Sequence, residues 1–181
     1  MKRFLGIVSA ISVLVIVAAF LVPLPIHREY RAVEIKLDDP AYRRECTIVM
    51  DGSYVLNRPF ADDRFEGDLV VSLYPETAEA DGLSALILGK NGSPLWYWRY
   101  ASDGPNPSRP DREEFILGSI LSNVFLTDFV ICIQGDNPLS ESGWKDGGSW
   151  GGWNDRTGYC IVTNCDSYEE AVAKVWKLYY R

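Results

Sequence analysis

Histidine is almost absent from this chain. The 181 residues include a single one, His27, which lies just after a long apolar run. A Ser-His-Asp or Cys-His catalytic device needs a histidine beside its nucleophile, and an H-E-x-x-H zinc site needs two. We therefore interpret His27 as a linker residue, and we predict no catalytic residue, no metal ion and no cofactor.

Cysteine is also scarce, and the four that occur form no C-x-x-C pair. A zinc ribbon or a thioredoxin-like motif is therefore not supported. Outside the cytoplasm disulfides are permitted, and four cysteines allow three pairings among which the sequence does not choose. Cys160 and Cys165 are the closest pair in sequence. The alternative is that the thiols pack as small hydrophobes, as the apolar runs around Cys46 and Cys132 indicate.

Charge is missing from one long segment, Phe4 to Val22. As a helix this segment is roughly 28 Å long, close to the ~30 Å hydrocarbon core of a bilayer. Lys2 and Arg3 precede it, and such a flank stays in the cytoplasm. A cleaved signal peptide is the alternative, but its apolar region is shorter and ends at a small-x-small site, which is missing here. We predict a single-pass signal-anchor in the cell membrane. Residues 1–26 form a cytoplasmic tip and transmembrane anchor in the lipid bilayer, and residues 27–181 form an extracytoplasmic domain.

Basic residues are the minority in this domain. The chain has 18 lysines and arginines against 25 acids, and two of the basic residues, Lys2 and Arg3, precede the apolar run. The remainder therefore has 16 basic and 25 acidic side chains, a formal charge of −9. An acidic surface argues against nucleic acid as a partner. The remaining ~155 residues are enough for one domain with a real core.

Two dipeptides predict β-hairpins in the domain. Asp51-Gly52 lies between strand-like runs, which would place Val49 across from Tyr54. Asn91-Gly92 lies between two further runs and predicts a second tight turn. Pairing around this second turn places these residues on one face: Leu83, Ala85 and Ile87 with Trp96, Trp98 and Tyr100.

Further strand-like runs are expected at residues 29–37, 68–74, 114–121, 124–134 and 159–163. The run in 124–134 is apolar without alternation, which is typical of a strand buried on both faces. The chain ends on a predicted helix, because Ser167 and Glu170 have capping-box spacing. Its apolar stripe contains Val172, Val175, Trp176 and Tyr179. The predicted fold is mostly β: an antiparallel β-sandwich or a curled sheet with one C-terminal α-helix.

A glycine-rich loop, residues 135–158, contains three tryptophans whose spacings of six and three fit no strand face. Ordering such a loop costs much backbone entropy, which the tryptophans could offset by packing. One or two of them would then form a lid on the core. The other interpretation is an exposed aromatic cluster, which is typical of recognition surfaces. The candidate ligand-binding residues are Trp144, Trp150 and Trp153, with Asp146, Asn154 and Asp155 for polar contacts.

Acidic residues around Arg64 form a second candidate group: Asp62, Asp63, Glu66 and Asp68. A glycosidase needs two carboxyls at a set separation, which a sequence does not show, and the EF-hand spacing of a calcium site is absent. A solvated charged turn with one ion pair is the simplest interpretation. We expect a binding or scaffolding module at the cell surface whose partner is a cell-wall or surface glycan or a protein. The alternative is a carboxylate-dependent surface hydrolase that acts on glycans.

One segment carries a resemblance. Asp51-Gly52-Ser53-Tyr54, then Phe60, then the run from Asp62 to Gly67 before a strand resembles small membrane-anchored, single-span proteins of gram-positive bacteria whose extracytoplasmic domains are uncharacterised. The resemblance covers this short segment and the layout of the anchor. It implies the topology, and because that group has no known activity it implies no functional residue.

Overall fold

The computed structural model describes residues 22–57, 61–100, 112–134 and 152–181. In this part the chain is mostly β, with one long helix at its C-terminal end. The strands are β1 (Leu24–Lys36), β2 (Asp39–Val55), β3 (Asp63–Val71), β4 (Gly82–Leu83), β5 (Leu86–Leu88), β6 (Ser93–Tyr100), β7 (Arg112–Ser122), β8 (Phe129–Ile133) and β9 (Tyr159–Thr163). The helices are α2 (Glu76–Glu79), the 3-10 turn η1 (Val124–Leu126) and α3 (Tyr168–Tyr179).

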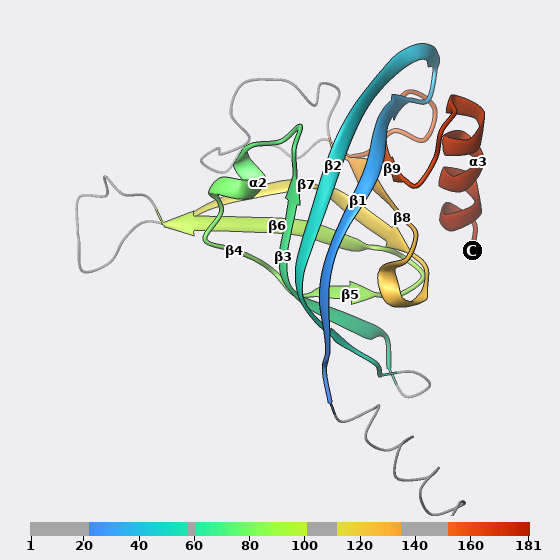
Figure 1. The fold of residues 1–181 in the computed structure, drawn as a ribbon. Coiled ribbons are helices and arrows are strands. Elements are labelled where there is room, and N and C mark those ends of the chain that lie inside the picture. The colour runs from blue at the N-terminus through green and yellow to red at the C-terminus, as the bar shows by residue number, and fades with distance from the viewer. Residues whose placement is uncertain (1–21, 58–60, 101–111, 135–151) are drawn as a thin grey trace, which may run out of the picture.

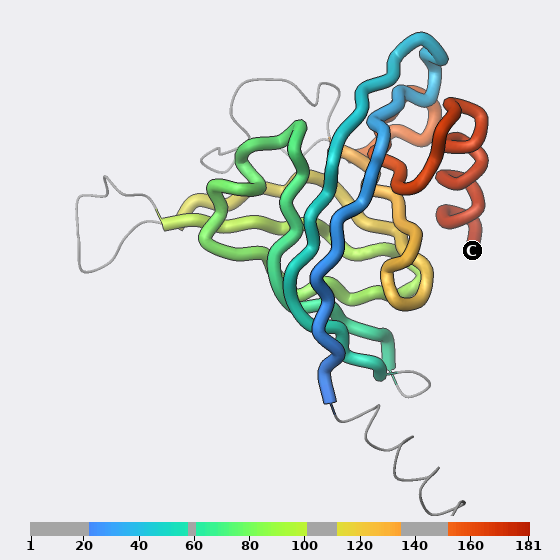
Figure 2. Tube along the Cα trace, in the orientation of Figure 1, coloured from blue at the N-terminus to red at the C-terminus, as the bar shows by residue number. Residues whose placement is uncertain are grey.

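The strands form one antiparallel sheet in the order β4-β6-β7-β8-β9-β1-β2-β3-β5. The sheet curls into a half-barrel, as Figures 1 and 2 show, so the alternative of a β-sandwich is not realised. Its two edge strands, β4 and β5, are joined by only Ser84 and Ala85, which brings the edges together. The Tyr97 hydroxyl on β6 donates to the Leu69 carbonyl on β3 at 2.7 Å across this seam.

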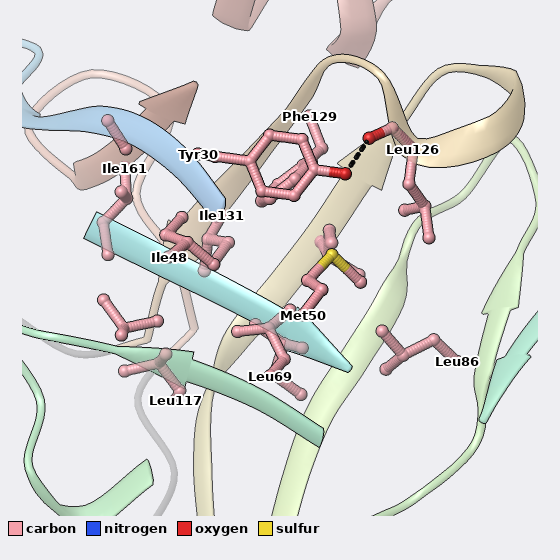
Figure 3. Packing of buried hydrophobic residues seen from close by; sticks show 14 of the residues in the cluster. Tyr30, Ile48, Met50, Leu69, Leu86, Leu117, Leu126, Phe129, Ile131 and Ile161 are labelled. Carbon is pink, nitrogen blue, oxygen red and sulfur yellow. Dashed lines mark hydrogen bonds between the residues drawn. The ribbon is translucent and has the colours of Figure 1, made fainter. Parts of the chain in front are cut away.

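The main hydrophobic core fills the inside of the curl. Figure 3 shows side chains from opposite walls pointing toward one another, and the Tyr30 hydroxyl donates to the Leu126 carbonyl at 2.7 Å at its margin. The labelled core residues from different strands include Ile48, Met50, Leu69, Leu117 and Ile131.

A second core lies on the outer face, where α3 covers β8, β9 and β1. Ala171, Val175 and Leu178 of α3 pack there against Val130 and Val162. Strands beneath a helix are buried on both faces, and all five residues of β8 are buried, as the sequence predicts. The predicted helix cap is also confirmed, because the Ser167 hydroxyl accepts from the Glu170 amide at 3.1 Å.

The hairpin predicted at Asp51-Gly52 is wrong. Both residues lie inside the continuous strand β2, where Asp51 pairs with Asp68 and Gly52 pairs with Gly67. A Cβ added at Gly52 would lie 2.2 Å from the Glu66 carbonyl oxygen. Gly52 therefore permits a close approach of two backbones instead of a turn.

The second predicted hairpin is right about the turn and wrong about the pairing. Gly92 has φ +74°, as a tight turn requires. However, β6 pairs with β4, with Leu83 opposite Tyr97, whereas β5 leaves to pair with β3. Ile87 is 48% exposed and Trp96 37%, so both side chains point outward.

Two strand boundaries also differ from expectation. β1 begins at Leu24, so the predicted domain boundary after Ile26 falls within a paired strand. The expected strand over 124–134 is interrupted by η1, in which Phe125 has φ 62°. Within the described residues, no helix is both long enough and apolar enough to cross a bilayer; residues 4–21 of the predicted span lie outside them.

Candidate functional site

Half of the predicted ligand-binding residues lie outside the described part of the chain: Trp144, Asp146 and Trp150. Trp153 is described and is half-buried, packed against the second core. Its indole N–H donates to the Tyr159 carbonyl at 3.2 Å. Trp153 therefore packs against the core, as one interpretation expects, and also leaves part of its ring exposed, as the other expects.

Trp153 joins three aromatic residues at the C-terminal end of α3, of which Tyr180 is the helix C-cap. Its ring centroid lies 6.5 Å from that of Trp176 and 5.3 Å from that of Tyr179. Tyr180 stacks on Trp176 at 5.6 Å with an interplanar angle of 23°. Tyr179 is 41% exposed and Tyr180 is 75% exposed. We call these four residues, Trp153, Trp176, Tyr179 and Tyr180, the α3 aromatic cluster.

The local sequence explains how the cluster assembles. Val175 and Leu178 face the second core, so Trp176, Tyr179 and Tyr180 of the same turns lie at its margin or in solvent. Trp153, the fourth member of the cluster, comes just before a tight turn that leads into β9. In this turn the Asn154 side-chain oxygen accepts from the Arg156 amide at 2.8 Å. The same oxygen accepts from the Thr157 amide, so the side chain of Asn154 holds the turn; Asn154 and Asp155 are both exposed.

Of the four residues in this cluster, the sequence predicts only Trp153 as a binding residue. The sequence predicts Trp176 and Tyr179 in the apolar stripe of the helix and predicts no role for Tyr180. The signal that distinguishes them is the phase of the helix, because the most buried positions, Ala171, Val175 and Leu178, define a stripe that leaves Tyr179 on its edge. Trp153 could be connected to them only through the tertiary structure.

Strand β1 contains a fully buried carboxylate. Glu34 is 0% exposed, and its two carboxylate oxygens accept from the hydroxyls of Tyr42 at 2.5 Å and Tyr74 at 2.6 Å. Arg44 Nη1 lies 3.9 Å from the same carboxylate. Burial, followed by the hydrogen bond to Glu34, raises the pKa of Tyr42 to about 12. Burial and then the charge of Glu34 raise the pKa of Tyr74 well above its ordinary value. Both phenols therefore stay protonated donors at neutral pH.

Asp63 is a second fully buried carboxylate, at the start of β3. It accepts from the Tyr54 hydroxyl at 2.6 Å and from the Asn57 amide at 2.9 Å. The expected solvated turn around Arg64 is therefore a strand with one acid turned inward. Arg64 and Glu66 do form an ion pair at 2.9 Å.

The two buried acids are not placed for glycosidase chemistry. Glu34 pairs with Arg44 of β2, whereas Arg64, next to Asp63, pairs with Val55 of the same strand. At ~3.3 Å per residue these positions are roughly 35 Å apart along β2, whereas paired catalytic acids lie about 5–9.5 Å apart in space. Each acid instead ties neighbouring segments together.

The described residues contain no group of three His, Cys, Asp or Glu side chains that could hold a metal ion. All four cysteines are buried free thiols. Comparison of the chain with protein-family models, with curated proteins and with solved structures finds no match. The α3 aromatic cluster is thus the candidate binding surface on its geometry alone.

Proposed function

We propose that this protein is a single-pass, membrane-anchored extracytoplasmic binding module whose ligand docks on the α3 aromatic cluster. The proposed ligand is a cell-wall or other surface glycan. The observation that carries the proposal is the contiguous group of four aromatic rings from two distant segments, two of which are more than 40% exposed. An exposed aromatic cluster of this kind is uncommon unless it is used for recognition.

The chemistry of the rings favours a sugar ligand. Tyrosine and tryptophan combine an apolar ring with a polar tip. A sugar has the complementary combination of an apolar C–H face and hydroxyl groups at its rim. The exposed Asp155 beside Trp153 offers an acceptor for such hydroxyls. The formal charge of −7 for the whole chain disfavours strongly anionic ligands.

The anchor in this proposal is the apolar segment Phe4 to Val22, with its N-terminus in the cytoplasm. β1 begins at Leu24, so a single residue, Pro23, separates the segment from the sheet. The domain would therefore lie within about 10 Å of the bilayer surface, because one residue spans at most ~3.6 Å.

Topology is tested by adding protease to intact cells that express the full chain. We expect loss of the C-terminal domain. A domain that is protected until the cells are lysed would contradict export. A domain released into the medium with a new N-terminus near residue 25 would contradict the retained anchor.

Binding is tested by sedimenting the detergent-solubilised full chain with purified cell-wall fragments. We expect Tyr179→Ala and Tyr180→Ala each to weaken binding by about tenfold, as for an aromatic residue at the centre of an interface. Tyr100→Ala is the matched control, because Tyr100 on β6 is 52% exposed, a value between those of Tyr179 and Tyr180. If all three variants bind as the wild type does, or if the wild type does not bind, the proposed site is wrong.

A further inference from the structure

Two of the four cysteines lie directly opposite each other in the sheet. Cys132 of β8 and Cys160 of β9 are register partners, and both side chains belong to the second core beneath α3. They are 4% and 0% exposed. The pair therefore meets on one face of two adjacent strands, away from solvent.

The backbone hydrogen bonds show whether Cys132 and Cys160 form a hydrogen-bonded or a non-hydrogen-bonded pair of the antiparallel sheet. The Asn164 amide donates to the Arg31 carbonyl at 2.9 Å, and the Leu37 amide donates to the Gly158 carbonyl at 3.1 Å. Hydrogen-bonded partners recur every second residue along a strand. Cys160 lies two residues after Gly158 and four before Asn164, so its backbone groups also point toward β1.

The same reasoning applies to β8. Its neighbour Gln134 donates its amide to the Leu117 carbonyl at 3.0 Å, and Cys132 lies two residues earlier. The backbone groups of Cys132 therefore point toward β7. Neither cysteine directs its backbone groups at the other strand, so the two form a non-hydrogen-bonded pair.

Such pairs bring their Cα atoms to about 4.5 Å, with the side chains closer than in hydrogen-bonded pairs. Disulfides form at Cα separations of about 4.4–6.8 Å. We propose that Cys132 and Cys160 are a modification site at which a cross-strand disulfide joins β8 to β9.

The reaction is thiol–disulfide exchange with a small-molecule disulfide such as oxidised glutathione. One cysteine thiolate attacks the glutathione disulfide and releases one glutathione thiol. The second cysteine then attacks this mixed disulfide and releases the other glutathione. Two protein thiols are oxidised to one disulfide, and one glutathione disulfide is reduced to two thiols.

The other two cysteines lie apart from this pair. Cys46 faces the main core inside the curl, on the other side of the sheet from the second core. Cys165 lies beyond the end of β9, and its thiol donates to the Val162 carbonyl at 3.5 Å. Proximity in sequence therefore does not bring Cys165 opposite Cys160.

The link would join the two ends of the segment 133–159, which contains Trp153 and leads into the α3 aromatic cluster. In the cell it requires an oxidising compartment, so its occurrence there depends on the proposed export of the domain. The geometry of the pair does not depend on that proposal, and the test below is made outside the cell.

Contact with the Cys132 thiol, followed by burial, raises the pKa of the Cys160 thiol. Since the thiolate is the reactive form, the folded protein reacts slowly. The full chain in detergent is therefore unfolded and refolded in a glutathione buffer with the oxidised form in excess. The remaining thiols are alkylated, and the protein is digested and analysed by mass spectrometry.

We expect the wild type to lose two thiols and to yield a peptide that links Cys132 with Cys160. The variant Cys46→Ala/Cys165→Ala should give the same link, whereas Cys132→Ala should leave Cys160 alkylated. Reduction of the link should lower the Tm by roughly 5–15 °C, as for a loop of this length.

Three results would overturn the proposal. These are a link between other cysteines, glutathione attached to Cys160 without a link, and four alkylated thiols after refolding. The wild-type digest decides among them without relying on the stability of any variant. None of these results bears on glycan binding, so failure here is distinguishable from failure of the proposed function.

Discussion

Two regions of the molecule expose aromatic rings, and they differ in what covers the rings. In the α3 aromatic cluster the rings contact one another, and Tyr180 is 75% exposed. On the outer face of β6, Trp98 also contacts a ring, that of Tyr100 at 5.4 Å, but in addition it has the Arg112 guanidinium 5.2 Å from its ring centroid and Gly82 against its edge. The chain itself therefore covers Trp98. The comparison teaches that exposed aromatic residues alone do not make a binding surface, because a surface also needs rings whose faces are left uncovered.

The largest difference between the two regions should appear in stability. Trp153 packs against the second core and donates a hydrogen bond, whereas Trp96 on β6 is 37% exposed. We expect Trp153→Ala to lower the free energy of unfolding by about 2–4 kcal/mol, somewhat less than a fully buried tryptophan. Trp96→Ala should cost at most about 1 kcal/mol. Urea unfolding of both variants measures these changes in the free energy of unfolding. Equal changes in the two variants would contradict the difference between the two regions.

The outward direction of Trp96 depends on the turn before β6. Gly92 has φ +74°, and a Cβ there would lie 2.8 Å from the Leu121 side chain. We expect Gly92→Val to destabilise the domain by about 1–3 kcal/mol, because a β-branched residue is strained at positive φ.

Gly152→Val is the control for this variant, since a Cβ at Gly152 meets nothing within 4 Å. An unchanged urea midpoint for Gly92→Val, or an equal loss in both variants, would show that the turn does not fix the register of β6.

Tyr97, the inward-facing tyrosine of β6, should make the stability of the fold depend on pH. Tyr97 lies between Trp96 and Trp98, is buried, and donates its hydroxyl to Leu69. Burial, followed by the charge of Asp68, raises the pKa of Tyr97 above its ordinary 10.0. The protonated phenol is thus favoured in the folded state, so its contribution is complete below pH 10 and is lost as the pH rises above 10.

Tyr97→Phe should cost about 1 kcal/mol at pH 7, for the lost hydrogen bond. It should also make the decline in stability above pH 10 shallower than in the wild type. Unfolding measured at a series of pH values from neutral to alkaline tests both effects. A decline as steep as that of the wild type would contradict the role of Tyr97.

The smallest effect should come from uncovering Trp98. Arg112→Ala removes the cation above the ring and the ion pair with Glu114 at 3.1 Å. We expect a loss of about 0.5–1 kcal/mol, as for cation–π contacts at exposed sites. The same variant, sedimented with cell-wall fragments, sharpens the comparison. If the variant binds more strongly than the wild type, the cover over Trp98 is what distinguishes the two regions. Unchanged binding would show that the cover is not the cause of the difference.

The sequence predicts those elements whose signal is local. The cap at Ser167 follows from spacing and is confirmed. The apolar run within 124–134 predicts a buried strand, and the structure confirms one over the shorter range Phe129–Ile133. Tertiary structure decides the rest. Gly52 carries a turn signal but is needed where two backbones approach closely, and Glu34 becomes buried because two tyrosines from other segments satisfy it.

The candidate site divides in the same way. Composition alone singles out Trp153 as a candidate. Its partners Trp176, Tyr179 and Tyr180 are separated from it by more than twenty residues, and only the packing of α3 against β9 unites them. The strand spacing of Trp96 and Trp98 predicts that they share a face, but it does not show which face is buried, and Leu95 and Tyr97 occupy the inner face.

The most direct test of the proposed binding surface is hydrogen exchange of the full chain with and without solubilised cell-wall glycan fragments. The account predicts slower exchange in peptides that contain Trp153 and in those that contain Trp176 to Tyr180, with no change in Ser93–Tyr100. Slower exchange confined to Ser93–Tyr100, or unchanged exchange throughout the chain at saturating glycan, would contradict it.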